Sequence, residues 1–341
     1  MKKVVVLMLS IMFVAVIAGC TSASKESKSI TIAWLPNESG EDIKSAREEI
    51  GALVAKATGK TVIHKTTTDY IIAIESIANG NADLAYLGPQ GYVEARTKNA
   101  KVEPLVVTSG VSGTAEDAVY YSWLAVKKGN EGPYKDGTGF KIDNLVGKRF
   151  SFVSNSSTSG FKVPSSNIVA YFSKMDKYKT LKAADLIEGG KTSFFSEVLF
   201  GGSHQGSAVN LFNGKVDVAA FCDTCVFNYV KLSEGTANKA GAIYKVKDDA
   251  AEPLNAFKGT EFILISTTPV LNSPFVVNTN NVNKETVKKL TDAFTSVETA
   301  NNPKIFVVKD SGIKGMFAKT GKEAFIVVND AWFNPVRELS K

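Results

Sequence analysis

Hydrophobic positions between residues 29 and 98 switch repeatedly between strand spacing and helix spacing. Residues 29–35 read as a strand, and apolar side chains then fall on one face of a helix predicted over residues 41–57. The further elements predicted here are a strand at 61–64, a helix at 69–78 capped by Asp69, a strand at 82–87 and a helix that begins at Pro89. This alternation predicts a parallel α/β lobe.

A second α/β series begins beyond a hydrophobic strand predicted at residues 120–126. The polar, glycine-rich segment 127–139 follows this strand, and apolar segments then recur at 149–153, 168–172 and 216–221. We therefore predict a second lobe over residues 125–262.

The chain then returns to the first lobe. A long apolar strand at 262–266 leads to a helix predicted at 284–295, whose pattern fits better with the first lobe, over residues 29–120 and 268–341. Two crossings, near 121–126 and 262–267, predict a hinge. A chain that leaves a lobe and returns to it is typical of binding proteins that close on a ligand in the cleft between lobes.

The N-terminus predicts export. Lys2 and Lys3 precede an apolar run at residues 4–16 that is too short for a comfortable membrane span, so residues 1–19 are predicted to be a signal peptide. The run closes on small residues before Cys20, in a pattern that resembles a bacterial lipobox; the alternative is an ordinary secretory peptide with an incidental cysteine. We expect lipid attached to Cys20 to anchor the protein to the extracytoplasmic face of the cell membrane, with residues 20–28 as a tether.

Composition agrees with two soluble lobes and argues against a nucleic-acid partner. The formal net charge is +6, and loss of Lys2 and Lys3 with the signal peptide lowers it to +4. Acidic and basic residues are mixed along the chain without an arginine-rich or aromatic-interleaved stripe, so no nucleic-acid binding is expected. The mild positive bias would help to steer an anion toward the protein.

Five short motifs appear in order along the chain. They are Leu35-Pro36-Asn37-Glu38, Thr68-Asp69-Tyr70, Tyr86-Leu87-Gly88-Pro89 with Tyr92, Ser157-Thr158-Ser159-Gly160 with Pro164, and Gly202-Ser203-His204 followed by Gly214-Lys215-Val216-Asp217. As an ordered set they resemble the PhnD-like family, the phosphate, phosphite and phosphonate binding proteins of ABC importers, over residues 30–339. The resemblance implies an α/β, two-lobed, type II periplasmic-binding-protein-like fold.

The strongest candidates for anion binding are Ser157, Thr158 and Ser159. They follow a predicted strand and precede a helix, where hydroxyls and unpaired backbone N–H groups both face an anion. The alternative is a plain serine-rich helix cap. His204 is predicted in the first turn of another helix and matches the position at which the family contacts its ligand, whereas His64 matches nothing and is interpreted as structural.

The remaining ligand contacts are implied by the resemblance alone. Tyr70 and Tyr121 resemble family tyrosines that approach the ligand from the opposite side, although buried tyrosines are also common in cores. Asp223 resembles a carboxylate that holds the ammonium group of aminoalkylphosphonates. The second acidic residue expected after the returning strand is missing from residues 268–274, which puts aminoalkyl specificity in doubt.

Cys222 and Cys225 flank Asp223 as a C-x-x-C pair. In an exported protein this spacing indicates a structural disulfide or two free thiols. A thioredoxin-like redox pair lacks its usual strand and helix context, and a zinc site lacks partner ligands, so we expect no metal and no cofactor.

These features together predict an extracytoplasmic solute-binding lipoprotein of an ABC importer. Its expected partners are a small phosphorus oxyanion and the permease and ATPase subunits, and the protein is expected to be a monomer. Alternatives are a binding protein for another phosphorylated solute, such as thiamine phosphate, or a ligand sensor. A hydrolase is not favoured, because no carboxylate is placed to orient His204 and no G-x-S-x-G turn is present.

Overall fold

The structure is a computed structural model that describes residues 27–308 and 311–339. The predicted signal peptide, Cys20 and all but the last two residues of the predicted tether therefore lie outside the described residues. Within the described part of the chain, none of the helices is both long and apolar enough to cross a membrane.

The first lobe is built on a six-stranded mixed sheet in the order β17-β4-β14-β3-β1-β2. β1 runs parallel to β2 and β3, whereas β14 pairs antiparallel with β3 and β4. The bounds are β1 Ser29–Trp34, β2 Thr61–Thr66, β3 Leu84–Tyr86, β4 Val102–Thr108, β14 Pro274–Asn278 and β17 Phe325–Ile326. The parallel strands β1, β2 and β3 are the strands between which the sequence predicted connecting helices.

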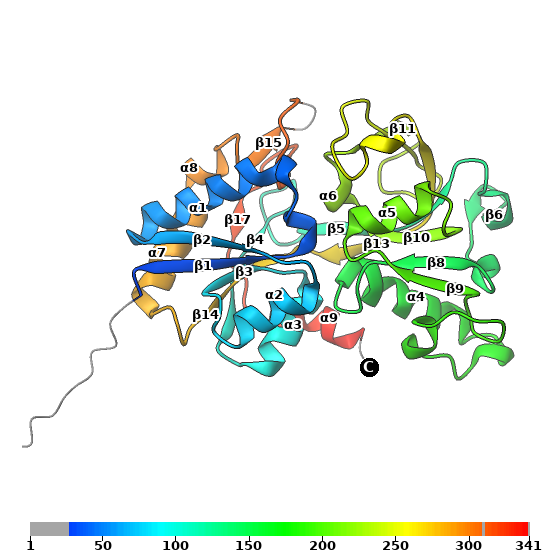
Figure 1. Cartoon of the computed structure of the whole chain (residues 1–341), viewed down its shortest axis with the longest axis horizontal. Coiled ribbons are helices and arrows are strands. Elements are labelled where there is room, and N and C mark those ends of the chain that lie inside the picture. Colours follow the sequence, from blue (N-terminus) through cyan, green and yellow to red (C-terminus); the bar gives the residue numbers. More distant parts are fainter. Residues whose placement is uncertain (1–26, 309–310, 340–341) are drawn as a thin grey trace, which may run out of the picture.

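Helices cover both faces of this sheet (Figure 1). Their bounds are α1 Lys44–Thr58, α2 Tyr70–Ala78, α3 Pro89–Lys98, α7 Lys284–Phe294, α8 Val297–Ala300 and α9 Asn334–Glu338. Side chains alternate along β1 as a strand requires. Trp34 belongs to the same hydrophobic core as Phe294 of α7, and its neighbour Ala33 belongs to the core that contains Ile74 of α2, on the other face.

The second lobe is built on a seven-stranded sheet in the order β11-β12-β13-β5-β10-β8-β9. Its strands are β5 Val119–Lys127, β8 Arg149–Phe152, β9 Glu197–Phe200, β10 Val218–Cys222, β11 Val230–Glu234, β12 Ile243–Val246 and β13 Glu261–Leu271. Its helices are α4 Val163–Phe172, α5 His204–Phe212 and α6 Asp223–Val226. Trp123 and Leu124 of β5 pack into separate cores on the two faces, so this lobe also has helices and loops on both sides of its sheet.

Short elements lie between these. They are the strands β6 Lys135–Asp136, β7 Gly139–Phe140, β15 Phe306–Val308 and β16 Phe317–Lys319, the 3-10 turns η1 Pro36–Glu38, η2 Glu41–Ile43, η3 Gly132–Tyr134, η4 Asp143–Leu145, η6 Asp176–Tyr178, η7 Ala183–Leu186, η8 Asn255–Phe257 and η9 Asp330–Phe333, and the π-helical turn η5 Thr158–Lys162.

Two long strands carry the chain between the lobes. β5 and β13 pair antiparallel along their length, from Lys127 opposite Phe262 to Val119 opposite Leu271. Residues 121–126 and 262–267 thus lie inside the second sheet. The chain changes sheets at the far ends of the pair, where Asn272 N–H donates to the Ala118 carbonyl at 3.0 Å and β14 begins two residues later.

Most predicted elements are present with small shifts at their ends. The helix predicted at 41–57 is split into η2 and α1, and residues 168–172 form the last part of α4. The sequence pattern predicted none of the strands β4, β9, β11, β12 and β14. α7 packs against α1 and β4 of the first lobe.

Candidate functional site

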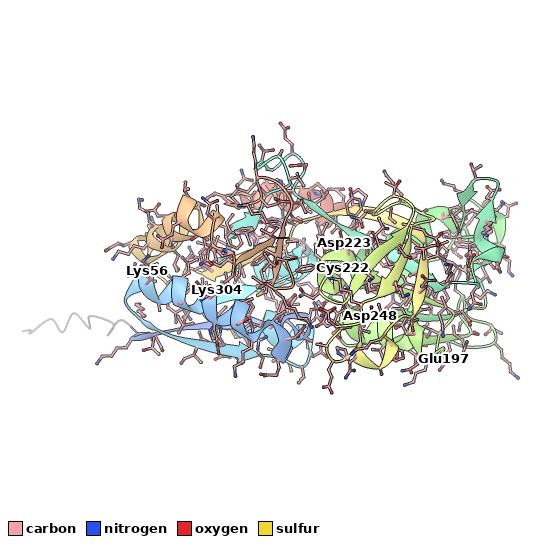
Figure 2. All side chains as sticks on the ribbon, turned by 90° about the horizontal axis from the view of Figure 1, so that it is seen from above. Lys56, Glu197, Cys222, Asp223, Asp248 and Lys304 are labelled. Carbon is pink, nitrogen blue, oxygen red and sulfur yellow. A yellow bond between two sulfur atoms is a disulfide. The ribbon has the colours of Figure 1, made fainter. Side chains whose placement is uncertain are left out.

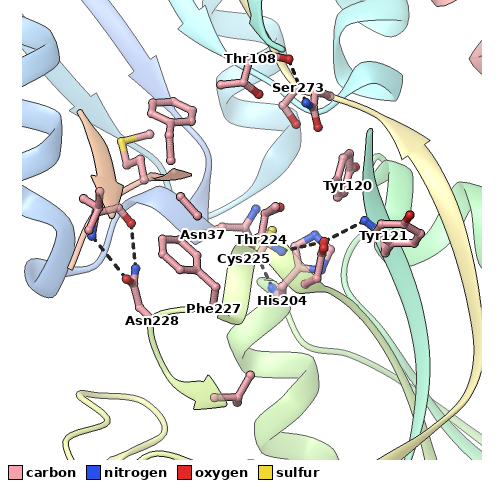
Figure 3. A pocket seen from close by; sticks show the side chains of 18 of the residues that line it. Asn37, Thr108, Tyr120, Tyr121, His204, Thr224, Cys225, Phe227, Asn228 and Ser273 are labelled. Carbon is pink, nitrogen blue, oxygen red and sulfur yellow. Dashed lines mark hydrogen bonds between the residues drawn. The ribbon is translucent and has the colours of Figure 1, made fainter. Parts of the chain in front are cut away.

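A cavity of about 700 Å³ lies between the two lobes and is lined by residues of both (Figure 3). All seven candidate ligand-binding residues line it: Tyr70, Tyr121, Ser157, Thr158, Ser159, His204 and Asp223. A cavity of this size between lobes is the usual form of a small-molecule site.

Ser157, Thr158 and Ser159 form a buried turn after β8. The Ser157 hydroxyl accepts from Gly160 N–H at 3.1 Å, so Ser157 caps the turn, as the alternative interpretation of a serine-rich helix cap requires. A Cβ on Gly160 would lie 2.3 Å from the Val153 side chain, so only glycine allows this close approach. Ser159 Oγ is buried and has no hydrogen-bond partner among residues 27–308 and 311–339, which leaves it available to a ligand.

His204 begins α5 and points its ring into the same space. Its Nδ1 accepts from Cys222 N–H at 3.0 Å, so the proton of the neutral ring is on Nε2, which lies 3.4 Å from Ser157 Oγ. Burial lowers the pKa of His204 to about 3. The residue is therefore a neutral hydrogen-bond donor at physiological pH, not a cation.

Asn37 and Tyr70 face this cluster from the first lobe. Asn37 Nδ2 donates to the Tyr70 hydroxyl at 2.6 Å, and Asn37 Oδ1 accepts from His204 N–H at 3.0 Å. Burial raises the pKa of Tyr70, whose hydroxyl lies near Ser157. Asn37 thus joins the two lobes at the site, although sequence analysis gave it no role beyond its place in a motif.

Thr158 joins the lobes at a second point. Its hydroxyl accepts from the Gln90 N–H, in the first turn of α3, at 2.9 Å. A Cβ on Gly88 would come within 2.9 Å of the same hydroxyl, so glycine permits this contact. The described conformation is closed, because these bonds connect the lobes directly.

Tyr120 and Tyr121 are neighbours on β5 with different surroundings (Figure 3). The Tyr120 ring is buried, and its hydroxyl lies near those of Ser159 and Thr158, while burial raises its pKa. Tyr121 uses its backbone N–H to reach Asp223. The family resemblance implied Tyr121, whereas the structure brings the hydroxyl of Tyr120 to the serine cluster. Both positions are tyrosine, so the sequence carried no signal to separate them.

Asp223 starts α6 with its carboxylate already engaged. Oδ1 accepts from Tyr121 N–H and Thr224 N–H, both at 2.8 Å, and Oδ2 accepts from Asn238 Nδ2 at 3.2 Å. Burial outweighs these bonds and raises the pKa of Asp223 to about 6. The residue fixes the strand β5 to the cavity wall as well as facing the cavity.

Glu38, which had no predicted role beyond its place in a motif, brings a second carboxyl group to the cavity from the first lobe. Burial raises its pKa to about 8, against the lowering effects of its own backbone N–H and Arg47. Residues 268–274 lack the second acid that the resemblance implies, but Glu38 brings an acid to the cavity from a different element, the turn η1.

Cys222 and Cys225 are joined by a disulfide next to His204. Cys222 N–H fixes the His204 tautomer, and the Cys225 carbonyl accepts from Gln205 Nε2 at 3.0 Å. Figure 2 shows Cys222 and Asp223 side by side in the second lobe near the first. The ligand atoms of His204 and both cysteines lie within 4.8 Å of one another, but the disulfide leaves neither sulfur as a thiolate for a metal.

Two α/β lobes joined by a pair of strands around a cavity define a two-lobed solute-binding protein. The chain belongs to the family of periplasmic substrate-binding proteins of phosphonate ABC transporters, whose model matches residues 32–333. This confirms the PhnD-like resemblance and the type II fold.

Individual relatives agree with this family. The phosphate-import protein PhnD of Mycolicibacterium smegmatis is 30% identical over 206 residues, which are 60% of this chain and 59% of that protein. The aligned segment thus spans less than two thirds of the length of this curated relative.

Two solved structures share the fold. A binding protein component of a phosphonate ABC transporter from Pseudomonas aeruginosa has a TM-score of 0.62 at 22% identity, covering 92% of this chain and 85% of that one. PhnD1 from Prochlorococcus marinus, in complex with methylphosphonate, has a TM-score of 0.62 at 18% identity, covering 92% of this chain and 97% of that one.

Proposed function

We propose that the protein is the solute-binding component of an ABC importer, and that it captures a phosphonate, phosphite or phosphate anion between its lobes and delivers it to the permease. The proposal rests on one observation: the buried hydroxyls of Ser157–Ser159 and the Nε2–H of His204 line the same cavity. The family and the relative that imports phosphate support it.

The donor set suits a tetrahedral oxyanion. Hydroxyls rotate to match several oxygens, and Tyr70 and Tyr120 add phenol donors that carry no charge. Three lysines line the cavity, and two of them donate to backbone carbonyls: Lys247 to Phe227 at 3.0 Å and Lys314 to Asp249 at 3.1 Å. A ligand that lacks several oxygens would leave buried donors unpaired, at a cost of about 1–3 kcal/mol each.

Ligand capture is proposed to use the two crossing strands as a hinge. Support comes from β5 and β13, which continue from the second sheet to the junction at Ala118 and Asn272. Asn37 and Thr158 would lock the closed state, because their bonds to the other lobe must break when the lobes part.

The protein's place in the cell is also part of the proposal. We place it on the extracytoplasmic face, anchored by lipid on Cys20, as a monomer that meets permease and ATPase subunits. We assign it no catalysis, because the cavity holds binding groups around His204 and, in the described part of the chain, no carboxylate is bonded to that ring: its Nδ1 accepts from Cys222 N–H.

A larger phosphorylated solute is the second candidate. A cavity of about 700 Å³ is in the range of drug-sized ligands and exceeds the needs of a bare phosphate. Phe227, Tyr229 and Phe317 line it and offer apolar surface to a substituent.

Calorimetry tests both candidates. The panel is phosphate, phosphite, methylphosphonate, aminoethylphosphonate and thiamine phosphate, with sulfate and acetate as controls. Binding confined to the phosphorus compounds supports the proposal, and an ester that binds more tightly than the free anions favours the second candidate. Tight binding of sulfate or acetate with none of the phosphorus compounds contradicts both.

A further inference from the structure

Glu38 is a buried acid in the cavity with an unused oxygen. It ends the turn η1, directly after β1, and its Oε2 is buried without a hydrogen-bond partner in residues 27–308 and 311–339. A buried carboxyl oxygen without a partner is costly. A group of the ligand would supply that partner.

The surroundings of Glu38 place it with the anion donors. Its neighbour Asn37 bonds to the Tyr70 hydroxyl at 2.6 Å and to His204 N–H at 3.0 Å. Tyr70, Tyr86 and Tyr120 line the same cavity as Glu38. Burial is the main cause that raises the pKa of each of these tyrosines, and the charge that Glu38 carries when it is ionised raises them further. The carboxyl therefore shares the space into which the serine hydroxyls point.

Within residues 27–308 and 311–339 no cation forms an ion pair with the Glu38 carboxyl, although the charge of Arg47 lowers its pKa. Arg47 on α1 donates to the backbone carbonyls of Glu38 at 2.5 Å and Gly40 at 2.6 Å, instead of pairing with the carboxyl. Tyr229, from the second lobe, faces both Glu38 and Asp42, whose Oδ2 is also buried and unpaired within the described residues. Burial dominates this environment and keeps Glu38 protonated at neutral pH.

An ionised carboxylate would repel a phosphoryl dianion, whereas a carboxyl with one proton would attract it. We propose that Glu38 and the bound anion share one proton, held between Glu38 and a phosphoryl oxygen. The complex can be described in two ways: a protonated Glu38 donates to a dianion, or an ionised Glu38 accepts from a monoanion. Both descriptions contain the same atoms and differ only in the position of the shared proton. The inference rests on the proposed function and makes Glu38 the residue that selects an oxyanion able to hold a proton.

Proton sharing changes how binding depends on pH. Above pH 8 the carboxyl group of Glu38 is ionised in the free protein. The free ligand is then a dianion if the second pKa of its phosphoryl group lies near or below neutrality, and that of a phosphomonoester is about 6. The complex must then take its proton from water. Affinity should fall about tenfold for each pH unit above 8, with uptake of about one proton per bound anion.

The test is calorimetry of the full chain with methylphosphonate at pH 7 and pH 9, in pairs of buffers with different ionisation enthalpies. The wild type should take up about one proton at pH 9, and Glu38→Gln should take up none while keeping its pH 7 affinity at pH 9, since the amide still donates. Glu103→Gln, an exposed acid of the first lobe, is the matched control and should behave as the wild type.

The outcomes separate this inference from the proposed function. Binding without proton uptake in the wild type, or equal uptake in Glu38→Gln, overturns proton sharing and leaves the importer proposal standing. Failure of the wild type to bind any phosphorus oxyanion at pH 7 overturns the function itself. Thermal unfolding of Glu38→Gln checks that the variant is folded, and Glu38→Asp, which keeps the acid, should restore proton uptake if the shared proton is the cause.

Discussion

The backbone N–H of Cys222 donates to Nδ1 of His204 at 3.0 Å, and this bond determines what the histidine can offer a ligand. With Nδ1 occupied as an acceptor, Nε2 carries the proton and faces Ser157. A buried neutral donor suits an anion that other neutral donors also surround, and it avoids the cost of burying a cation.

His204 is expected to make the protein sensitive to acid. Its pKa is about 3 in the folded protein against an ordinary 6.5, so the unfolded chain binds the extra proton first as the pH falls. The stabilising contribution is complete above pH 6.5 and is lost between pH 6.5 and 3, at about 1.4 kcal/mol per pH unit. Chemical denaturation from pH 7 to pH 4 should show a shallower decline for His204→Gln than for the wild type. Equal slopes would contradict the buried neutral state.

Thr158→Ala should weaken phosphonate binding by about 1.5–3 kcal/mol, the range for a hydrogen bond to a charged group. The variant loses a cavity hydroxyl and also the acceptor for Gln90 N–H on the other lobe. Calorimetry with methylphosphonate measures the loss, and Thr158→Ser should recover most of it. Thr180→Ala, at an exposed site of the second lobe, is the control. An unchanged affinity in Thr158→Ala would remove this residue from the site.

The two neighbouring tyrosines give a direct comparison. Tyr120→Phe should weaken binding by about 1 kcal/mol or more, because its hydroxyl lies beside Ser159 and Thr158. Tyr121→Phe should change little, since Tyr121 holds Asp223 through its backbone N–H. Parallel titrations of both variants decide between them, and a larger loss in Tyr121→Phe would restore the choice made from the sequence.

The sequence predicted those features, such as helix starts and caps, that depend on residues close together in the chain. Asp69 caps α2 through its side chain, and Pro89 begins α3, as local pattern indicated. Asn37 received no role because its partner His204 lies on the other lobe, 167 residues away in the sequence. Glu38 received none because the cavity that it lines is formed by residues of both lobes. Local periodicity carries no information on such contacts.

Elements with weak local signals were also missed. β12 is four residues long and β14 five. β14 is placed by pairing with β3 and β4, which lie far away in the chain. Tyr120 and Tyr121 could not be separated for a similar reason, since the direction of each ring depends on how β5 sits against β10 and β13.

Membrane anchoring is tested by Cys20→Ala. The thiol is expected to carry the lipid, so the variant should move from the membrane fraction to the soluble extracytoplasmic fraction. Fractionation with an alkaline wash, followed by detection of the protein, measures the change. Retention of the variant in the washed membranes would contradict the lipobox interpretation.

Asp223 should read the substituent of the ligand rather than its phosphorus group. Its Oδ1 accepts two backbone N–H groups, which an asparagine oxygen can also do, so Asp223→Asn should keep these two bonds while removing the charge and losing the bond from Asn238 Nδ2 to Oδ2. The pKa of about 6 means that the carboxyl ionises as the pH rises from 5 to 7. An ammonium group would gain from that ionisation, and a methyl group would not. The affinity of aminoethylphosphonate relative to methylphosphonate should therefore rise over this pH range in the wild type and stay constant in Asp223→Asn. Calorimetry with both ligands at pH 5 and pH 7 measures this ratio, and an equal loss for both ligands in the variant would show that Asp223 only supports β5.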